Sequence, residues 1–327
     1  MHGQLIDMVV AGVRQLTPRI REYVLASADG SPLPRGAPGA HVELHTHSDL
    51  SGPIVRHYSL VGGQGLADDR ADHYRIAVQR EDRQRGSAHI HDTFAPGTRL
   101  KVSRPKNNFP LDLRDRRSLL IAGGIGITPI YAMLRSVVRR GRPFAFVYAG
   151  RTQDQLAYAA EAMELAGAAG RLHVSGDPAT DHLDMAALLA AQSDDTTVYV
   201  CGPLLMIEAV HAAARTLGWP DARVRSERFT AGPAPDDAPF AVELRRTGRT
   251  VEVGRDTSIL DALTASGVDV LSDCRRGECG LCPLPVLEGG ERISHRDSYL
   301  SDEERAAGDT LCICVSRLPG GTLVLDA

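Results

Sequence analysis

The sequence predicts a multidomain protein in which an antiparallel β-barrel, a doubly wound parallel α/β domain and a smaller α+β domain follow one another. At 327 residues, the chain is too long for one ordinary hydrophobic core. Its apolar pattern changes from short strands to alternating strands and helices, and a stretch rich in proline and alanine separates the last part. We therefore expect domains at residues 1–112, 113–230 and 240–327, with a linker at 231–239.

The composition is that of a soluble globular protein. Hydrophobic residues make up 43% and charged residues 24%, and the net charge of −4 does not favour nucleic acid or an anionic membrane as partner. The chain has no apolar run near the ~20 residues of a membrane span, and its N-terminus lacks the features of a secretory signal. Five of the six cysteines lie in the last fifty-four residues, which favours a metal centre over a disulfide framework. We expect a cytoplasmic monomer.

The first segment is predicted to be β-rich. Apolar or alternating runs are separated by turns rich in glycine and proline, a spacing typical of a small antiparallel barrel or sandwich. The runs lie at residues 42–45, 58–61, 74–78 and 100–102.

From Ser118 the pattern alternates strand and helix with short connections, which predicts a doubly wound parallel sheet. The expected strands cover 119–122, 144–148, 172–174 and 198–200, and the expected helices cover 130–140, 154–166, 184–191 and 204–217.

Beyond the linker, residues 240–244 and 250–253 are predicted to pair as a hairpin. A helix is expected from Ser258 to Ser266, because Ser258 suits the N-cap and Asp261 follows three residues later.

Three cysteines of the last segment have a spacing that indicates an iron–sulfur cluster. Four residues separate Cys274 from Cys279, two separate Cys279 from Cys282, and a further cysteine follows about thirty residues on. This is the ligand spacing of a plant-type [2Fe–2S] cluster. Gly277 and Gly280 would let the backbone turn tightly around the sulfurs. Buried structural cysteines rarely have this spacing, and a zinc ribbon would need two separated CxxC pairs.

A glycine-rich loop lies between a buried strand and a helix in the α/β segment. It runs Gly123-Gly124-Ile125-Gly126-Ile127-Thr128-Pro129. At such a position backbone N–H groups and the helix N-terminus hold phosphate, which predicts a nucleotide site, although a glycine-rich turn can also serve packing alone.

Two further strings suit redox cofactors. Cys201-Gly202-Pro203 ends a strand of the α/β sheet, where a thiol can touch a nicotinamide ring or simply fill the core. Arg56-His57-Tyr58-Ser59 lies in a strand of the first segment. Its arginine suits a phosphate, its tyrosine offers a flat face and its serine a hydroxyl, so it is a candidate flavin site.

Two groups of polar side chains do not require a functional role. His41, His45 and His47 nearly alternate on one strand, and solvent-facing histidines explain them better than zinc does. Arg275 and Arg276 suit either a solvated loop tip or a docking role.

With these motifs in order, the chain resembles the phthalate dioxygenase reductase and vanillate demethylase reductase family over essentially its whole length. The matching strings are Arg56 to Leu60, Arg85 to Ser87, Pro105 to Leu111, Ala122 to Pro129, Cys201 to Pro203, Glu227 to Phe229, His295 to Asp297 and Cys314 to Arg317. The resemblance implies an FMN-binding barrel, an NADH-binding domain and a C-terminal ferredoxin domain of β-grasp fold. It also implies that the chain feeds electrons to a separate Rieske-type oxygenase.

The resemblance implies roles for individual residues. Ser59 and Thr128 would lie by the flavin ring and Cys201 by the nicotinamide, as the catalytic positions. The flavin site would include Arg56, His57, Tyr58, Val78, Gln79, Gly86, Ser87 and Phe229, and the nucleotide site Gly123, Gly124, Gly126, Asp177, Gly202 and Pro203. Cys274, Cys279, Cys282 and Cys314 would hold the cluster.

Four alternatives stay open. Cys312 follows Cys282 after the family's usual twenty-nine residues and Cys314 after thirty-one, but Cys314 has the family's downstream context and is preferred. Both could face the same side of a strand. Gly150-Arg151 ends the second α/β strand without an acidic residue, so NADPH competes with NADH. The acceptor could also be a cytochrome P450, or the chain a ferredoxin-like carrier or redox sensor.

Overall fold

The structure is a computed structural model that describes residues 5–48, 52–62, 72–81, 86–176, 183–229, 237–277, 279–297 and 299–327. Its internal contacts divide the chain into two compact units, Met1–Glu227 and Arg228–Ala327. Each unit is considered by itself. None of the helices in the described ranges has both the length and the apolar character that a membrane span needs.

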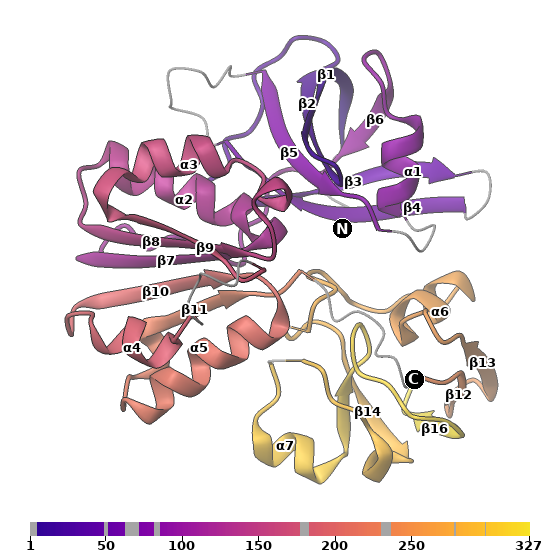
Figure 1. Cartoon of the computed structure of the whole chain (residues 1–327). Coiled ribbons are helices and arrows are strands. Elements are labelled where there is room, and N and C mark those ends of the chain that lie inside the picture. Colours follow the sequence, from indigo (N-terminus) through magenta and orange to yellow (C-terminus); the bar gives the residue numbers. More distant parts are fainter. Residues whose placement is uncertain are drawn as a thin grey trace. The chain divides into compact units, whose positions relative to one another are not determined.

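The first unit begins with an antiparallel barrel, as predicted. Six strands pair in the order β4-β3-β6-β1-β2-β5, and every pair is antiparallel. A bridge between Leu60, just after β4, and Ile76 in β5 brings the two ends of the sheet together. The strands are β1 (Ile6–Thr17), β2 (Ile20–Ser27), β3 (His41–Ser48), β4 (Gly52–Ser59), β5 (His73–Gln79) and β6 (Arg99–Val102), and helix α1 (Gly86–Thr93) follows β5 (Figure 1).

The sequence pattern failed to reveal β1, β2 and α1. In the pairing of β1 with β2 the register shifts between Val10 and Gly12 and again between Gln15 and Thr17. Each irregularity places an extra residue in one strand and interrupts the alternation of inward and outward side chains. The period-two signal is therefore weak in the longest strand of the barrel.

The same unit contains a five-stranded parallel sheet of order β11-β10-β7-β8-β9. Helices α2 and α3 cover one face and α4 and α5 the other, which confirms the doubly wound arrangement (Figure 1). The strands are β7 (Arg117–Gly123), β8 (Phe144–Gly150), β9 (Gly170–Val174), β10 (Thr196–Cys201) and β11 (Val224–Glu227). The helices are α2 (Ile127–Arg139), α3 (Ala159–Ala166), α4 (Met185–Ala190) and α5 (Leu204–Thr216).

Helix α3 begins five residues later than the sequence predicts. Tyr158 precedes it in a left-handed conformation, with φ of 58°, which interrupts the helix expected from residue 154. Its ring is buried and stacks on Tyr131 at 5.3 Å, and its hydroxyl donates to Glu22 of the barrel at 2.9 Å. Arg14 also pairs with Glu22 and with Glu161 of α3. These contacts join the barrel to the parallel sheet within the first unit.

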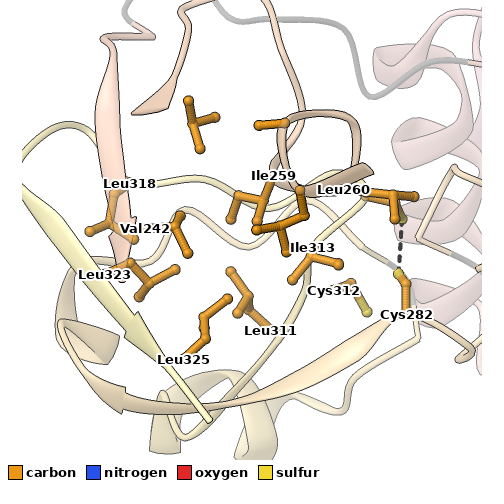
Figure 2. Close-up of a cluster of buried hydrophobic side chains, with 14 of the residues drawn as sticks. Val242, Ile259, Leu260, Cys282, Leu311, Cys312, Ile313, Leu318, Leu323 and Leu325 are labelled. Atoms are coloured by element: carbon orange, nitrogen blue, oxygen red, sulfur yellow. Dashed lines mark hydrogen bonds between the residues drawn. The ribbon is translucent and has the colours of Figure 1, made fainter. Parts of the chain in front are cut away.

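The second unit has a mixed sheet of order β13-β12-β16-β14-β15, and its predicted hairpin and helix are confirmed. Ser258 caps α6 (Ile259–Ala265) by accepting a hydrogen bond from the Asp261 N–H at 3.0 Å. The remaining elements are β12 (Phe240–Leu244), β13 (Arg249–Val253), β14 (Pro283–Glu288), β15 (Thr310–Cys312), β16 (Thr322–Leu325) and α7 (Asp302–Ala307). Apolar side chains of α6 and of β12, β15 and β16 form one core, and Cys282 and Cys312 belong to it (Figure 2).

The predicted linker is held at its C-terminal end. Residues 231–236 lie outside the described ranges, but Asp237 is buried between Arg296 and Arg317. Arg317 also donates to the Gly254 carbonyl at 2.9 Å. The second unit therefore fixes the chain at Asp237, three residues before β12. The predicted three-domain boundaries stay a prediction, because the barrel and the parallel sheet share one compact unit.

Removal of the Tyr158 hydroxyl tests the connection between barrel and parallel sheet. Tyr158→Phe leaves the buried Glu22 carboxylate without this donor, so we expect the first unit to lose about 1–3 kcal/mol of stability. Calorimetry should show a lower transition for the first unit and an unchanged one for the second. Tyr131→Phe removes a hydroxyl from the other ring of the stack and should have a smaller effect; equal effects would contradict the role of the Glu22 bond.

Candidate functional site

The carboxyl ends of β7 and β10 lie side by side at the point where the strand order reverses. Ala122 pairs with Cys201 in register, and the predicted nucleotide loop and the Cys201-Gly202-Pro203 string both follow directly. Ligands of open parallel sheets bind at such a switch point. The fold therefore brings two of the predicted motifs together.

Most glycines of these two loops serve close packing between the loops. A Cβ on Gly126 would lie 2.2 Å from the Cys201 carbonyl oxygen, and one on Gly202 would lie 3.0 Å from the Gly123 Cα. A Cβ on Gly123 would overlap Pro203 at 2.6 Å. Gly124 differs, because it has φ of +52° and no heavy atom within 4 Å of the position of a Cβ. It is the position in this loop where the backbone is open to a ligand.

The N-terminus of α2 suits an anion. No side chain in the described ranges caps α2, and a 3-10 turn at Gly124–Gly126 leads directly into this helix of thirteen residues, so the helix dipole favours a phosphate at this end. The Thr128 hydroxyl is buried and donates to the Ile125 carbonyl at 3.1 Å. The Tyr148 hydroxyl donates a hydrogen bond to the Gly124 carbonyl of the loop at 3.1 Å. Burial raises the pKa of Tyr148 above its ordinary value, so the hydroxyl stays protonated.

Cys201 is fully buried at the end of β10, between Ala122 of β7 and Glu227 of β11. Pro203 occupies the N-cap of α5. The structure thus places the cysteine at the carboxyl end of β10, beside the nucleotide loop. Its predicted contact with that ring stays a prediction.

The candidate flavin strand is β4. The Arg56 guanidinium donates to the Val55 carbonyl at 2.8 Å, Ser59 is buried, and burial raises the pKa of Tyr58. The His57 ring stacks on His41 at 5.3 Å. His41 is itself buried, so the expectation that the strand histidines face solvent is wrong for this residue. His41 and His47 lie on the same face of β3. His41 is enclosed there because the His57 ring stacks on it, whereas His47 is exposed.

The remaining predicted flavin residues lie around β5 and α1. Val78 is in the barrel core and its carbonyl lies 2.9 Å from the His91 ring, whereas Gln79 is exposed. Gly86 is the first residue of α1, and the Ser87 hydroxyl accepts a hydrogen bond from the Glu81 N–H at 3.1 Å.

Two further residues were predicted for these sites. Phe229 is half-buried and belongs to the second unit. Asp177, predicted as a ribose contact, lies outside the described residues.

Four of the five cysteines of the second unit are arranged in two pairs. The Cys274 sulfur accepts from the N–H groups of Arg276 and Cys279, both at 3.4 Å, and the Cys279 sulfur accepts from the Cys274 N–H at 3.5 Å. The Cys282 and Cys314 sulfurs lie 3.2 Å apart, the contact drawn as a dashed line at Cys282 in Figure 2. Backbone N–H groups directed at sulfur favour thiolates, and a [2Fe–2S] cluster takes its four thiolates as two per iron.

The described residues contain no group of three or more ligands gathered around a single metal ion. A two-iron cluster does not need one, because its protein ligands are divided between two metals.

The fourth cysteine is not settled by strand geometry. Cys312 is the last residue of β15 and is fully buried, whereas Cys314 lies in the following turn, in which the Val315 N–H donates to the Cys312 carbonyl at 3.2 Å. The expectation that both lie on one strand is therefore wrong. Hydrogen bonds from Cys312 and Cys314 lower the pKa of the Cys282 thiol to about 3, and those with Cys282 raise the pKa of both partners.

The cysteine loop needs glycine at both predicted positions. Gly277 and Gly280 have φ of +74° and +69°, and a Cβ on Gly280 would lie 2.1 Å from the Tyr299 ring. Arg275 is also left-handed and pairs with Asp261 at 2.7 Å. Arg276 is buried, so the interpretation as a solvated loop tip is wrong for it. Its burial beside Cys274 follows from the tight turn that the glycines allow.

Comparisons with known proteins match both units. Residues 120–212 match the oxidoreductase NAD-binding domain family and residues 242–319 the 2Fe-2S iron-sulfur cluster binding domain family. A putative toluene-4-sulfonate monooxygenase system reductase subunit from Comamonas testosteroni is 40% identical over 324 residues, 98% of each chain. Vanillate O-demethylase oxidoreductase from Pseudomonas sp. (strain HR199 / DSM 7063) is 36% identical over 98% of this chain and 100% of its own.

The solved structure of phthalate dioxygenase reductase, described as a modular structure for electron transfer from pyridine nucleotides to [2Fe–2S], is 31% identical, with a TM-score of 0.79. It is matched over 99% of this chain and 98% of its own. The fold and the paired cysteines thus define an NAD-dependent iron–sulfur oxidoreductase. The chain belongs to the phthalate dioxygenase reductase-type family, and its cofactors are NADH, FMN and a [2Fe–2S] cluster.

The close packing at Gly126 can be tested directly. A methyl group in Gly126→Ala would overlap the Cys201 carbonyl, so the two loops must separate. We expect the folded state to be destabilised by about 1–3 kcal/mol. NADH binding, measured by isothermal titration, should weaken at least tenfold, or about 1.4 kcal/mol. Gly141→Ala is the control. Gly141 lies just after the C-terminal end of α2, with φ of +59° and no heavy atom within 4 Å of the position of a Cβ, so its substitution strains the backbone without pushing two loops apart. Unchanged NADH affinity in Gly126→Ala would contradict this reading of the loop.

Proposed function

We propose that this chain is the NADH-dependent reductase component of a two-component Rieske oxygenase of the ring-hydroxylating or demethylating type. Electrons pass from NADH through FMN to the [2Fe–2S] cluster and on to a separate oxygenase. The observation that carries the proposal is the presence, in one chain, of a nucleotide loop at a switch point and two pairs of cysteines in a β-grasp unit. The relatives, which are named as reductase subunits of oxygenase systems, support it.

The order of the cofactors follows from their chemistry. A nicotinamide delivers two electrons as a hydride, whereas a [2Fe–2S] cluster accepts one, and FMN when bound supplies the exchange between the two. The residues of the chain bind and orient these groups. The α2 N-terminus and the open backbone at Gly124 hold the pyrophosphate, and Cys201 lies at the nicotinamide end of the same edge.

Strand β4 is the proposed flavin-facing strand. Arg56 suits the FMN phosphate, while Tyr58 and Ser59 suit its ring and its polar edge. Ser87, at the first turn of α1, supplies a hydroxyl beside a helix N-terminus for the phosphate region. The Thr128 hydroxyl acts from the nucleotide side, where its bond to the Ile125 carbonyl fixes its direction.

We assign the four cluster ligands as Cys274, Cys279, Cys282 and Cys314. The Cys282–Cys314 contact at 3.2 Å completes the second pair, and the slight exposure of Cys314 contrasts with the full enclosure of Cys312 in the core. Cys312 remains the competing ligand, because its side chain, like that of Cys314, is hydrogen-bonded to Cys282 and lowers the pKa of the Cys282 thiol.

Substitution of the two cysteines decides between them. Cys314→Ser should destroy or strongly perturb the iron–sulfur absorbance and its electron paramagnetic resonance signal, because the second pair loses a thiolate. Cys312→Ser exchanges a core sulfur for a hydroxyl and should leave the spectrum nearly intact, at a stability cost of about 1–3 kcal/mol. The reverse outcome would assign the ligand to Cys312.

The acceptor has one competing class. A heme-dependent oxidative N-demethylase beta subunit is 41% identical to this chain, and an intact type IV self-sufficient cytochrome P450 monooxygenase contains a region 34% identical to it. A heme protein is therefore the second candidate acceptor. A simple carrier is disfavoured, since it would not need the complete parallel sheet with its switch-point loops.

NADH is the proposed donor over NADPH. Arg151 is exposed after β8, where it could meet a ribose 2′-phosphate, but the family resemblance favours NADH. Because the cluster needs reduced thiolates, we place the protein in the reducing cytoplasm. We also propose that it is a monomer.

A single variant tests the order of electron flow. Cys279→Ser should lose the cluster while NADH still reduces the flavin, because the nucleotide loop and strand β4 lie in the other compact unit. NADH-driven reduction of cytochrome c should fall at least tenfold, whereas flavin bleaching in a stopped-flow trace should stay within about twofold of wild type, or about 0.4 kcal/mol of barrier. Wild-type cytochrome c reduction without the cluster would contradict the proposed path.

A further inference from the structure

The string His295-Arg296-Asp297 contains a buried carboxylate to which the proposed electron path gives no task. The Asp297 side chain has no exposed surface. Its oxygens accept from the Leu300 N–H at 2.9 Å and from the Ser316 hydroxyl at 3.2 Å. A buried carboxylate is costly even when it is hydrogen-bonded, so its presence here invites a functional explanation.

Asp297 lies against both parts of the chain that carry the cluster ligands. Its Cα would be 2.7 Å from a Cβ on Gly277, which stands between Cys274 and Cys279 in the cysteine loop. Its partner Ser316 follows Cys314 by two residues, and the Ser316 hydroxyl also accepts from the Arg296 N–H at 3.3 Å. Asp297 therefore contacts the loop of the first pair through its Cα and the turn of the second pair through its carboxylate.

The surrounding positive charge only partly offsets this carboxylate. Arg305 donates to the Asp297 backbone carbonyl at 2.8 Å, but its Nε lies 3.9 Å from the carboxylate and it also pairs with Asp302. The His295 ring nitrogen lies 3.7 Å from the carboxylate, and burial lowers the pKa of His295, which favours its neutral form.

We propose that Asp297 is a positioning residue that also tunes the cluster. It ties the Gly277 loop to the turn after Cys314, and its charge disfavours the addition of an electron and so lowers the cluster's reduction potential. Charge, hydrogen bonding and solvent exposure are the known determinants of iron–sulfur potentials, and the low interior dielectric strengthens the charge effect. The inference rests on the proposed cluster and does not depend on the identity of the oxygenase.

The test is an electron paramagnetic resonance titration of the reduction potential in the purified holoprotein, without NADH or an acceptor. Asp297→Asn keeps the shape, since its amide oxygen can accept from Leu300 and its NH₂ group can donate to the Ser316 hydroxyl. We expect the equilibrium to shift about tenfold towards the reduced cluster, a rise of about 59 mV for one electron. The readout requires neither nucleotide nor oxygenase, so failure of the proposed electron path would leave it unaffected.

Two further variants separate charge from tether. Asp302→Asn removes the same charge from a fully exposed partner of Arg305 and should leave the equilibrium between oxidised and reduced cluster within about twofold of wild type. Ser316→Ala keeps the Asp297 charge but removes a hydrogen bond that offsets it, so the potential should move in the negative direction, opposite to that of Asp297→Asn. Unchanged potentials in Asp297→Asn and Ser316→Ala, or equal shifts in Asp297→Asn and Asp302→Asn, would overturn the proposal.

Discussion

Close approach of backbone to backbone, which only glycine allows, is the constraint on which both ends of this molecule depend. In the first unit Gly126 lets the nucleotide loop lie against the Cys201 carbonyl, and in the second Gly277 lets the cysteine loop lie against Asp297. Any Cβ at these positions would force the two loops apart. The same close packing orients the backbone in each unit. In the first unit it exposes the α2 N-terminus to a phosphate, and in the second it directs two backbone N–H groups at the Cys274 sulfur.

The motifs with local chemistry could be predicted from the sequence. The cysteine spacing, the glycine loop and the Ser258 cap each depend on a few neighbouring residues, and the structure has all three in the predicted settings. The alternation of strand and helix likewise indicated the parallel sheet. The features that could not be predicted from the sequence involve contacts between residues far apart in the chain. The bulges of β1 hid its alternation. Tyr158, whose hydroxyl reaches Glu22 in the barrel, has a left-handed backbone that no local pattern indicated.

The same distinction explains the candidate sites. Sequence spacing identified three cysteines and left Cys312 and Cys314 as alternatives for the fourth. Both were expected on one strand, because nothing in the local pattern shows that β15 ends at Cys312. The structure shows that a turn follows, which releases Cys314 from strand alternation and brings its sulfur to Cys282. Asp297 belonged to a recognised string, yet its role could not be read until its neighbours at Gly277 and Ser316 were known. Buried polar groups of this kind are specified by the fold and not by their own sequence context.

The central claim is that one chain converts a hydride into single electrons at a cluster. The most direct measurement is an anaerobic titration with NADH that follows flavin absorbance and the paramagnetic signal of the reduced cluster together. The account predicts that full reduction takes up about three electrons per chain, two in the flavin and one in the cluster, and hence about one and a half equivalents of NADH. Complete flavin bleaching at one equivalent, with no cluster signal on further addition, would contradict it.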